Sequence, residues 1–149
     1  DCVPIFLGHP SGAIGLLHAG WRGTVAHILE VGIARFTEAG LRVGELRMHL
    51  GPAICGRCFE VGPEVRDAFV QQNRLWADCF VRAEADRFMA DLPGLARLRL
   101  QGLGIHRLQG NDSQLDWCTF SQASRFFSHR RDSRVLGSTG RMAACIWRR

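Results

Sequence analysis

This sequence predicts a mixed fold of short β-strands and helices, and three observations lead to that prediction. The first residues hold two apolar segments around a loop of Gly, Pro and Ser, which is typical of a β-hairpin. Residues 23–39 then carry apolar side chains at helical spacing, which indicates an amphipathic helix. Further strand-like and helix-like segments follow without a linker, repeat or low-complexity stretch, so we expect one domain over residues 1–149.

The hairpin is predicted to pair the strands Val3–Leu7 and Ala13–Leu17. If it folds symmetrically about Pro10, Cys2 lies opposite His18, with the two Cβ atoms about 4.5–5.5 Å apart. A thiolate and an imidazole at that separation can hold one metal ion or form a nucleophile–base pair. Both interpretations compete with a simpler one, in which the cysteine is a small buried side chain and the histidine belongs to the core.

The residues after the second strand form a small-residue turn that leads into a helix, with the sequence Ala19-Gly20-Trp21-Arg22-Gly23. The N-terminus of a helix offers unpaired N–H groups to an anion. Arg22 adds a positive charge there, and we expect it to contact a bound anion. The hairpin and the turn together predict a site with a metal ligand or nucleophile, a base and an anion cradle.

The remaining elements follow from periodicity and from helix and strand signals. Residues 73–90 lack a clean period and predict a loop with one short strand, and the basic run at 128–134 predicts a solvated loop. His49 alternates away from the core side of its strand, so we assign it no metal. Helices are predicted over Gly23–Ala39, Pro63–Gln72, Asp91–Gln101 and Ser121–Phe127, and strands over Glu45–Leu50, Phe59–Val61, Ile105–Leu108 and Arg141–Trp147.

Composition limits the classes of protein to consider. Apolar residues make up 46% and charged residues 22%, as in ordinary globular domains, and no apolar run is long enough to cross a membrane. No signal-peptide pattern is visible, and six cysteines without one predict free thiols in a reducing cytoplasm. The net charge of +5 suits anionic substrates such as phosphate, and it also suits nucleic acid.

Cys55-Gly56-Arg57-Cys58 forms a C-x-x-C motif, which by itself is compatible with redox or zinc chemistry. The chain has no second C-x-x-C to complete a structural zinc site. We therefore expect these two cysteines to be ordinary members of a loop.

Three stretches, in this order along the chain, resemble the motifs of the multicopper polyphenol oxidase (laccase-like) family, also called the YfiH or peptidoglycan editing factor family. They are Asp1–Pro4 with His18–Gly23, then Leu50–Ile54 with Cys58–Gly62, and finally Phe126–Asp132 with Gly140–Ala143. The resemblance implies an α+β fold with layered mixed β-sheets, flanking helices and a site at strand ends. Most members are described as purine nucleoside phosphorylases, and a similar architecture occurs in cysteine hydrolases such as toxin deamidases.

The resemblance implies a zinc-dependent enzyme that cleaves adenosine, inosine, guanosine or methylthioadenosine with phosphate, giving the free base and a ribose 1-phosphate. It also implies adenosine deaminase activity, which gives inosine. Cys2 and His18 match two of the family's three zinc ligands. The third is a histidine in a further N-terminal segment, which we expect to precede this sequence. Cys118 lies in the family's Cys-Thr element and is not a ligand in the family.

Three alternatives stay open. The family is also associated with copper-dependent oxidation of phenols, although six scattered histidines without an H-x-H pair argue against several bound copper ions. A cysteine-type hydrolase or amidase acting in peptidoglycan editing would use His18 to deprotonate Cys2. Nucleic-acid binding would depend on residues 128–134, which have few interleaved aromatic residues. We expect small-molecule partners, no nucleic acid and no membrane. The sequence decides neither the oligomeric state nor zinc against copper.

Overall fold

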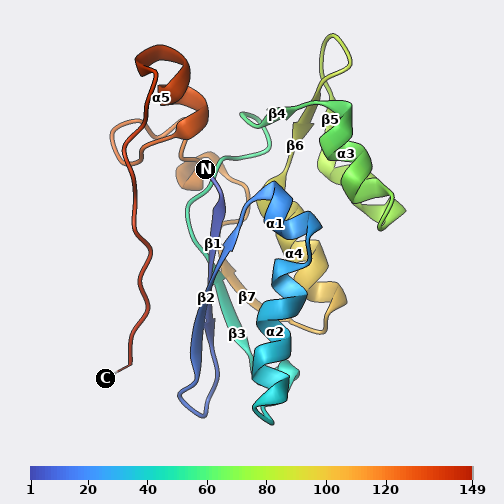
Figure 1. Cartoon of the computed structure of the whole chain (residues 1–149), viewed down its shortest axis with the longest axis vertical. Coiled ribbons are helices and arrows are strands. Elements are labelled where there is room, and N and C mark those ends of the chain that lie inside the picture. The colour runs from blue at the N-terminus through green and yellow to red at the C-terminus, as the bar shows by residue number, and fades with distance from the viewer. Residues whose placement is uncertain (149) are drawn as a thin grey trace.

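Two β-sheets organise the chain in the computed structural model, which describes residues 1–148 (Figure 1). The larger sheet has the strand order β2-β1-β3-β7 and is mixed, because β3 and β7 run parallel while the other pairs are antiparallel. The smaller sheet has the order β4-β6-β5 and is antiparallel. The strands are β1 (Val3–Gly8), β2 (Ile14–Ala19), β3 (Arg47–Leu50), β4 (Glu60–Val61), β5 (Phe80–Arg82), β6 (Phe88–Ala90) and β7 (Arg107–Gly110).

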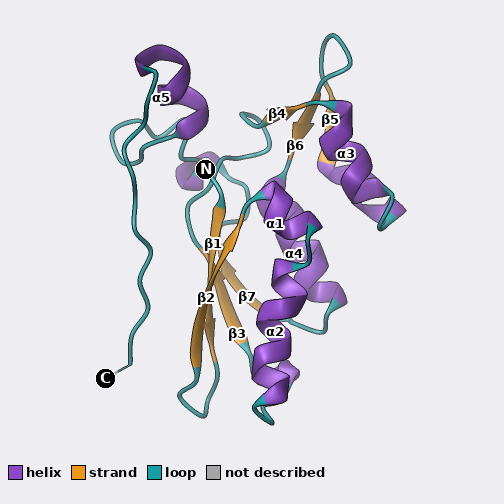
Figure 2. Ribbon diagram, viewed as in Figure 1, coloured by secondary structure: helices purple, strands orange, loops and turns teal. Residues whose placement is uncertain are grey.

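Helices flank the sheets, which confirms the α+β class (Figure 2). Helices α1 and α2 pack beside the larger sheet together with α4, while α3 lies beside the smaller sheet and α5 lies near the start of β1. None of the described helices is long and apolar enough to cross a membrane. The α-helices are α1 (Trp21–Val25), α2 (Ile28–Glu38), α3 (Pro63–Val70), α4 (Leu92–Gly102) and α5 (His129–Leu136), and the 3-10 helices are η1 (Val43–Glu45), η2 (Arg74–Cys79) and η3 (Leu115–Trp117).

The first strand separates the core from the face that carries the candidate site. Val3, Ile5 and Leu7 are fully buried and pack in one cluster with side chains of α2 and α4. Pro4 and Phe6 point to the opposite face, where they are only half-buried. This alternation with period two places Cys2 on the open face, next to Pro4 and Phe6.

The register predicted for the hairpin is wrong by two residues. The loop is centred on Ser11 rather than Pro10, because the amide of His9 donates to the carbonyl of Ala13 and Gly12 adopts the left-handed region at φ 86°. Pro4 therefore lies opposite His18, and the partner of Cys2 by the same register is Gly20. A shift of two residues keeps side chains on the same face, so Cys2 and His18 become diagonal rather than direct neighbours.

The helix predicted over Gly23–Ala39 is broken into α1 and α2 at His27, which adopts a left-handed conformation at φ 64°. In a continuous helix the carbonyl of Thr24 would accept from the amide of residue 28. Here it accepts from the amide of His27 at 3.2 Å and from Nη1 of the buried Arg99 at 2.6 Å, and Nη2 of the same side chain contacts Nδ1 of His27 at 2.6 Å. The turn at His27 and a long-range arginine from α4 thus share the acceptor that would join the two helices.

The C-terminal predictions are also corrected. Residues 128–134 were expected to form a solvated loop and instead begin α5, while the helix expected over Ser121–Phe127 is a series of turns. Arg131 stabilises these turns, because its guanidinium donates to the carbonyls of Thr119, Phe120 and Phe126. The strand expected over Arg141–Trp147 does not form, since this mostly exposed segment pairs with no strand in the described part of the chain.

Other local predictions are confirmed. Asp91 caps α4 by accepting from the amide of Gly94 at 2.9 Å, and Gly40 follows α2 at φ 75°. His49 is exposed, on the side of β3 away from the core. The stretch 73–90 is more regular than expected, since it contains η2, β5 and β6.

Candidate functional site

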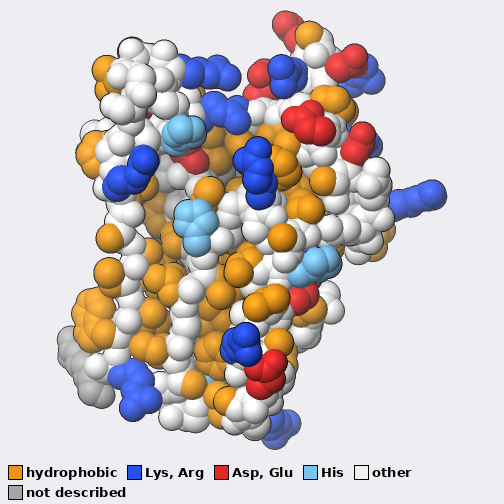
Figure 3. All heavy atoms as spheres, in the orientation of Figure 1, with side chains coloured by type: hydrophobic (Ala, Val, Ile, Leu, Met, Phe, Trp, Pro, Cys, Tyr) orange, Lys and Arg blue, Asp and Glu red, His pale blue; other side chains and the backbone are white. Residues whose placement is uncertain are grey.

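A cavity of about 1160 Å³ lies on the open face of the hairpin, between β1, the start of α1 and the C-terminal segment. Its apolar wall includes Phe6, Leu16, Trp21 and Phe126, and its polar groups come mainly from the first and last parts of the chain. Figure 3 shows histidine and arginine side chains gathered on this face between α5 and α1. An apolar cavity with a few convergent polar groups is the usual form of a small-molecule site.

The side chains of Cys2 and His18 both approach Gly20, which has no side chain to separate them. A Cβ atom on Gly20 would lie 2.8 Å from Sγ of Cys2 and 3.9 Å from Nε2 of His18. The sulfur and the imidazole nitrogen therefore both lie within 4 Å of the same position beside Gly20, although the two residues are not directly paired. Both side chains line the cavity, with Cys2 half-buried and His18 exposed.

Arg22, the predicted anion contact, also lines the cavity, at the first turn of α1. Its guanidinium carbon lies 4.3 Å from the centre of the Trp21 ring, at cation–π distance. The indole thus steadies an exposed arginine beside the cavity. With five residues, α1 is too short to act as an anion site through its N-terminus alone, so the positive charge at this edge comes from the side chain.

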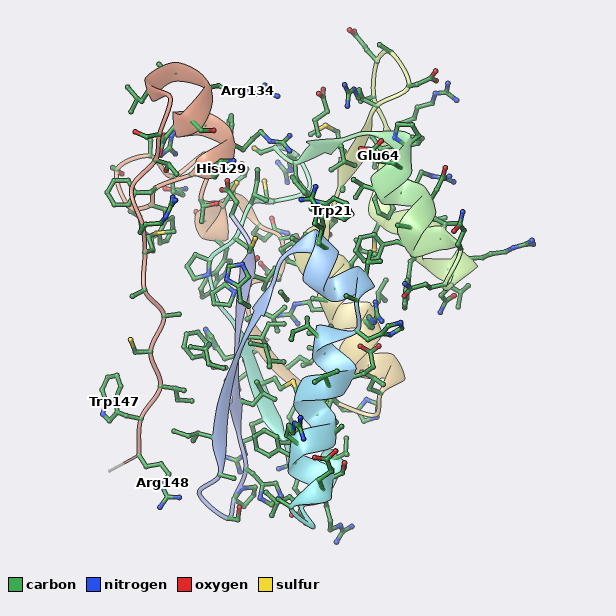
Figure 4. All side chains as sticks on the ribbon, viewed as in Figure 1. Trp21, Glu64, His129, Arg134, Trp147 and Arg148 are labelled. Carbon is green, nitrogen blue, oxygen red and sulfur yellow. The ribbon has the colours of Figure 1, made fainter. Side chains whose placement is uncertain are left out.

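The structure adds residues of α5 that the sequence interpretation did not select. His129 and Arg130 line the same cavity, and Figure 4 shows His129 at the start of α5, facing the region where Trp21 begins α1. Ser128 accepts from the amide of Arg131 and its own amide donates to Asp132, which fixes where the helix starts. The signal was present in the sequence, as a serine followed by a carboxylate four residues later in a helix-compatible run.

Asp1 joins α5 to the N-terminal strand. One of its carboxylate oxygens accepts from the amide of Arg130 at 2.8 Å, and the other accepts from the hydroxyl of Thr119 at 2.6 Å. The backbone carbonyl of the same residue accepts from the amide of Ile54 at 2.9 Å. Three distant segments are thereby fixed around the residue that precedes Cys2.

A second group of potential ligands consists of Cys55, Cys58 and Cys118, whose sulfur atoms all lie within 4.8 Å of one another. These three thiols could hold a metal ion, and they are the one group of three or more His, Cys, Asp or Glu side chains with that geometry in residues 1–148. The expectation that the two C-x-x-C cysteines are ordinary loop residues missed this cluster, because its third member lies 60 residues beyond Cys58.

The surroundings shift the pKa values of the three thiols in different directions. Burial raises the pKa of Cys55, and burial together with a hydrogen bond to Cys55 raises the pKa of Cys58 to about 12. Burial also opposes ionisation of Cys118, but hydrogen bonds from Ser121 and from the Cys55 amide outweigh it and lower its pKa to about 7. The cluster thus has one sulfur on which negative charge is stabilised and two that stay protonated at neutral pH.

A family model described as multi-copper polyphenol oxidoreductase laccase matches residues 1–149. Among curated proteins, a purine nucleoside phosphorylase of Pseudomonas aeruginosa is 44% identical over 149 residues, which cover 99% of this chain and 57% of that protein. The purine nucleoside phosphorylase YfiH of Escherichia coli strain K12 is 38% identical over 148 residues, covering 99% of this chain and 56% of that protein. The chain therefore spans little more than half the length of these relatives.

Solved structures share the fold. A Neisseria meningitidis protein of family DUF152 matches with a TM-score of 0.81 and 36% identity, over 89% of this chain and 52% of that one. The hypothetical protein YfiH of Bacillus licheniformis matches with a TM-score of 0.80 and 29% identity, over 89% of this chain and 50% of that one. The architecture in Figure 1 is thus that of the YfiH and DUF152 proteins.

Proposed function

The chain belongs to the multi-copper polyphenol oxidoreductase laccase family, and from its relatives and its site we propose that it forms the catalytic part of a zinc-dependent purine nucleoside phosphorylase. Its substrates would be phosphate and a purine nucleoside such as adenosine, inosine, guanosine or methylthioadenosine. The observation that carries the proposal is the convergence of Cys2 Sγ and His18 Nε2 beside Gly20, at the edge of an apolar cavity lined by arginines.

The donor set of Cys2 and His18 suits zinc. Thiolate sulfur and imidazole nitrogen are its common ligands, and a catalytic zinc site uses three protein ligands with one position left open. The two side chains would supply two of them, and the third would be the histidine that the resemblance places in a preceding segment. When bound, zinc would supply Lewis-acid polarisation of an oxygen that attacks the substrate.

Oxidation of phenols by several copper ions fits the described residues less well. Such sites are rich in histidine. The one three-ligand group within residues 1–148 consists of cysteines alone, and the donor beside His18 is the thiol of Cys2.

The cavity walls suit the two parts of the substrate. Phe126 and Trp21 offer aromatic faces for a purine base, with which aromatic side chains stack favourably. Arg22 and Arg130 supply positive charge for phosphate at the ends of the cavity formed by α1 and α5. In phosphorolysis an oxygen of phosphate bonds to C1′ of the ribose as the bond from C1′ to the base nitrogen breaks, and these arginines would offset the negative charge of the attacking group.

The same pocket would also deaminate adenosine, with water in place of phosphate: its oxygen would bond to C6 of the base as the bond from C6 to the exocyclic nitrogen breaks, which releases ammonia and leaves inosine. The two reactions compete for one bound nucleoside and differ in which carbon faces the attacking oxygen. Omitting phosphate should therefore move the product from adenine to inosine.

The test is product analysis with the intact protein, adenosine and phosphate. Cys2→Ser and His18→Ala should each lower adenine release by at least about 100-fold, since each removes one proposed ligand. The control is Cys79→Ser, which removes a free thiol that does not line the cavity and should leave the rate unchanged. Wild-type rates in either site variant would overturn the assignment.

A cysteine-type hydrolase, with amidase action in peptidoglycan editing as one possible role, is the second candidate. The observation in its favour is the proximity of Cys2 and His18, which would also serve as nucleophile and base. A chelator separates the two candidates, because it should abolish phosphorolysis and leave a thiol-dependent hydrolase active. A thiol-alkylating reagent should inactivate both.

A further inference from the structure

We propose that Cys55, Cys58 and Cys118 form a second metal site, which binds a thiophilic closed-shell cation, Zn²⁺ or Cu⁺, behind the wall of the cavity. This site is separate from Cys2 and His18 and does not depend on the proposed function. The ion would hold together two chain segments that meet at Asp1 and so support the strand that carries Cys2.

The geometry of the sulfur atoms is the first argument. All three lie within 4.8 Å of one another. Sulfur atoms bonded to one zinc ion at about 2.3 Å are about 3.8 Å apart in tetrahedral geometry, so only small side-chain rotations separate the present arrangement from a bound one. All three thiols are free, and none is committed to a disulfide.

The backbone around the cluster is fixed by hydrogen bonds. The amide of Cys58 donates to the carbonyl of Cys55 at 3.0 Å, which closes the C-x-x-C turn. The segment around Cys118 pairs in parallel with Ala53, and the amide of Cys55 donates to Cys118 Sγ at 3.3 Å. An N–H group directed at sulfur stabilises the thiolate, which is the form that binds metal. The ligands are therefore held in place before an ion arrives.

The choice of ion follows from the donors. Three sulfur atoms without an oxygen or nitrogen ligand disfavour magnesium and calcium and favour Zn²⁺ or Cu⁺. Cys55 and Cys118 are almost completely buried, whereas Cys58 is half-buried and leaves an approach from solvent. Cu⁺ is satisfied by three thiolates, while Zn²⁺ would take a water molecule as its fourth ligand on the Cys58 side.

The position of the cluster suggests what the ion would do. Ile54, which precedes Cys55, donates its amide to the carbonyl of Asp1, and Thr119, which follows Cys118, donates its hydroxyl to the Asp1 carboxylate. An ion between the cysteines would join these two contacts on the residue before Cys2. We therefore expect loss of the ion to loosen the N-terminal strand first.

The experiment titrates the reduced intact protein with Zn²⁺ alone, Cu⁺ alone and, as an optical probe, Cd²⁺ alone. Most of the ultraviolet band that arises from thiolate-to-cadmium charge transfer should come from the three thiols of the cluster, and a smaller part should come from Cys2. Cys58→Ser and Cys118→Ser should each reduce affinity at the cluster by at least about 10-fold and shrink the band. Cys145→Ser and Cys2→Ser should leave the band of the cluster in place.

Two controls keep the test decisive. Cys58 is half-buried, so its serine variant is expected to fold even if the fully buried Cys118→Ser variant does not, and circular dichroism checks both. Of the Zn²⁺ and Cu⁺ titrations, the one in which wild type binds one more ion than Cys58→Ser identifies the metal that the cluster prefers. Equal binding of all three ions by wild type and Cys58→Ser would overturn the proposal, and so would the failure of the fully reduced wild type to bind any of the three ions at the cluster.

Discussion

Replacing Gly20 by alanine tests the proposed convergence of Cys2 and His18 with a single methyl group. The new Cβ would lie 2.8 Å from Cys2 Sγ, which is closer than unbonded atoms approach, and 3.9 Å from His18 Nε2. The thiol must therefore rotate away, whereas the backbone need not move, because Gly20 has φ −78° and ψ 167°, values open to any residue.

The two consequences of this substitution differ in size. Loss of glycine flexibility in the unfolded chain favours the variant by about 0.4–1 kcal/mol, and displacing the cysteine from its rotamer costs about 0.5–1.5 kcal/mol. The free energy of unfolding should therefore change by no more than about 1 kcal/mol. Because the substitution turns a proposed metal ligand out of position, zinc affinity should fall by about 10–100-fold, which is the loss seen when a group that orients a metal ligand is removed.

The assay pairs zinc titration with phosphorolysis of inosine, and urea unfolding measures stability. Gly8→Ala is the matched control, because it lies in the same hairpin and its Cβ would meet nothing within 4 Å. We expect Gly8→Ala to behave as wild type in zinc binding and catalysis. Wild-type zinc affinity and rate in Gly20→Ala would refute the argument that the two side chains act at this point.

Three further predictions follow from other contacts. Arg99→Leu should lower the free energy of unfolding in urea by about 2–3 kcal/mol, because it removes the buried charged partner of Glu30 and one of the two donors to the Thr24 carbonyl; a loss below about 0.5 kcal/mol would contradict this. Ser128→Ala should weaken α5 by about 1 kcal/mol through loss of its cap, seen as faster amide exchange at residues 129–132 with no change in α2. The hydrogen bond from Arg131 and the one from the Ser128 amide hold the pKa of Asp132 below its usual value, so its stabilising effect is complete at pH values above the unfolded pKa and is lost as the pH falls through the lower folded pKa. In Asp132→Asn the free energy of unfolding, measured as the pH is lowered, should lack the loss that comes from protonation of Asp132. Identical acid profiles for the variant and wild type would count against this role of Asp132.

Local signals in the sequence were enough to predict several elements. Asp91 and Pro93 mark the start of α4, and the alternation along β3 correctly placed His49 on the side away from the core. Cys2, His18 and Arg22 were selected from the residues alone, and all three line one cavity. These features depend on neighbours within a few residues, which a sequence pattern can represent.

Features that depend on distant contacts were not predicted. The break at His27 is accompanied by a hydrogen bond to the Thr24 carbonyl from Arg99, 75 residues later, which no local pattern indicates. The hairpin register was missed for a different, local reason: hydrogen bonds between His9, Gly12 and Ala13 centre the loop on Ser11, whereas the prediction assumed symmetry about Pro10. Cys118 joins the C-x-x-C motif only because its segment pairs with Ala53, and no local spacing encodes that pairing.

The central claim, that Cys2 and His18 form a metal-dependent phosphorolysis centre, is tested most directly by phosphorus NMR. Metal-analysed intact protein is incubated with inosine and phosphate, and the signal of ribose 1-phosphate is followed for wild type and Cys2→Ser. The account predicts a ribose 1-phosphate signal that grows with phosphate in the wild type, disappears with a chelator and is absent in Cys2→Ser. A signal of equal size in Cys2→Ser, or none in zinc-loaded wild type, would contradict it.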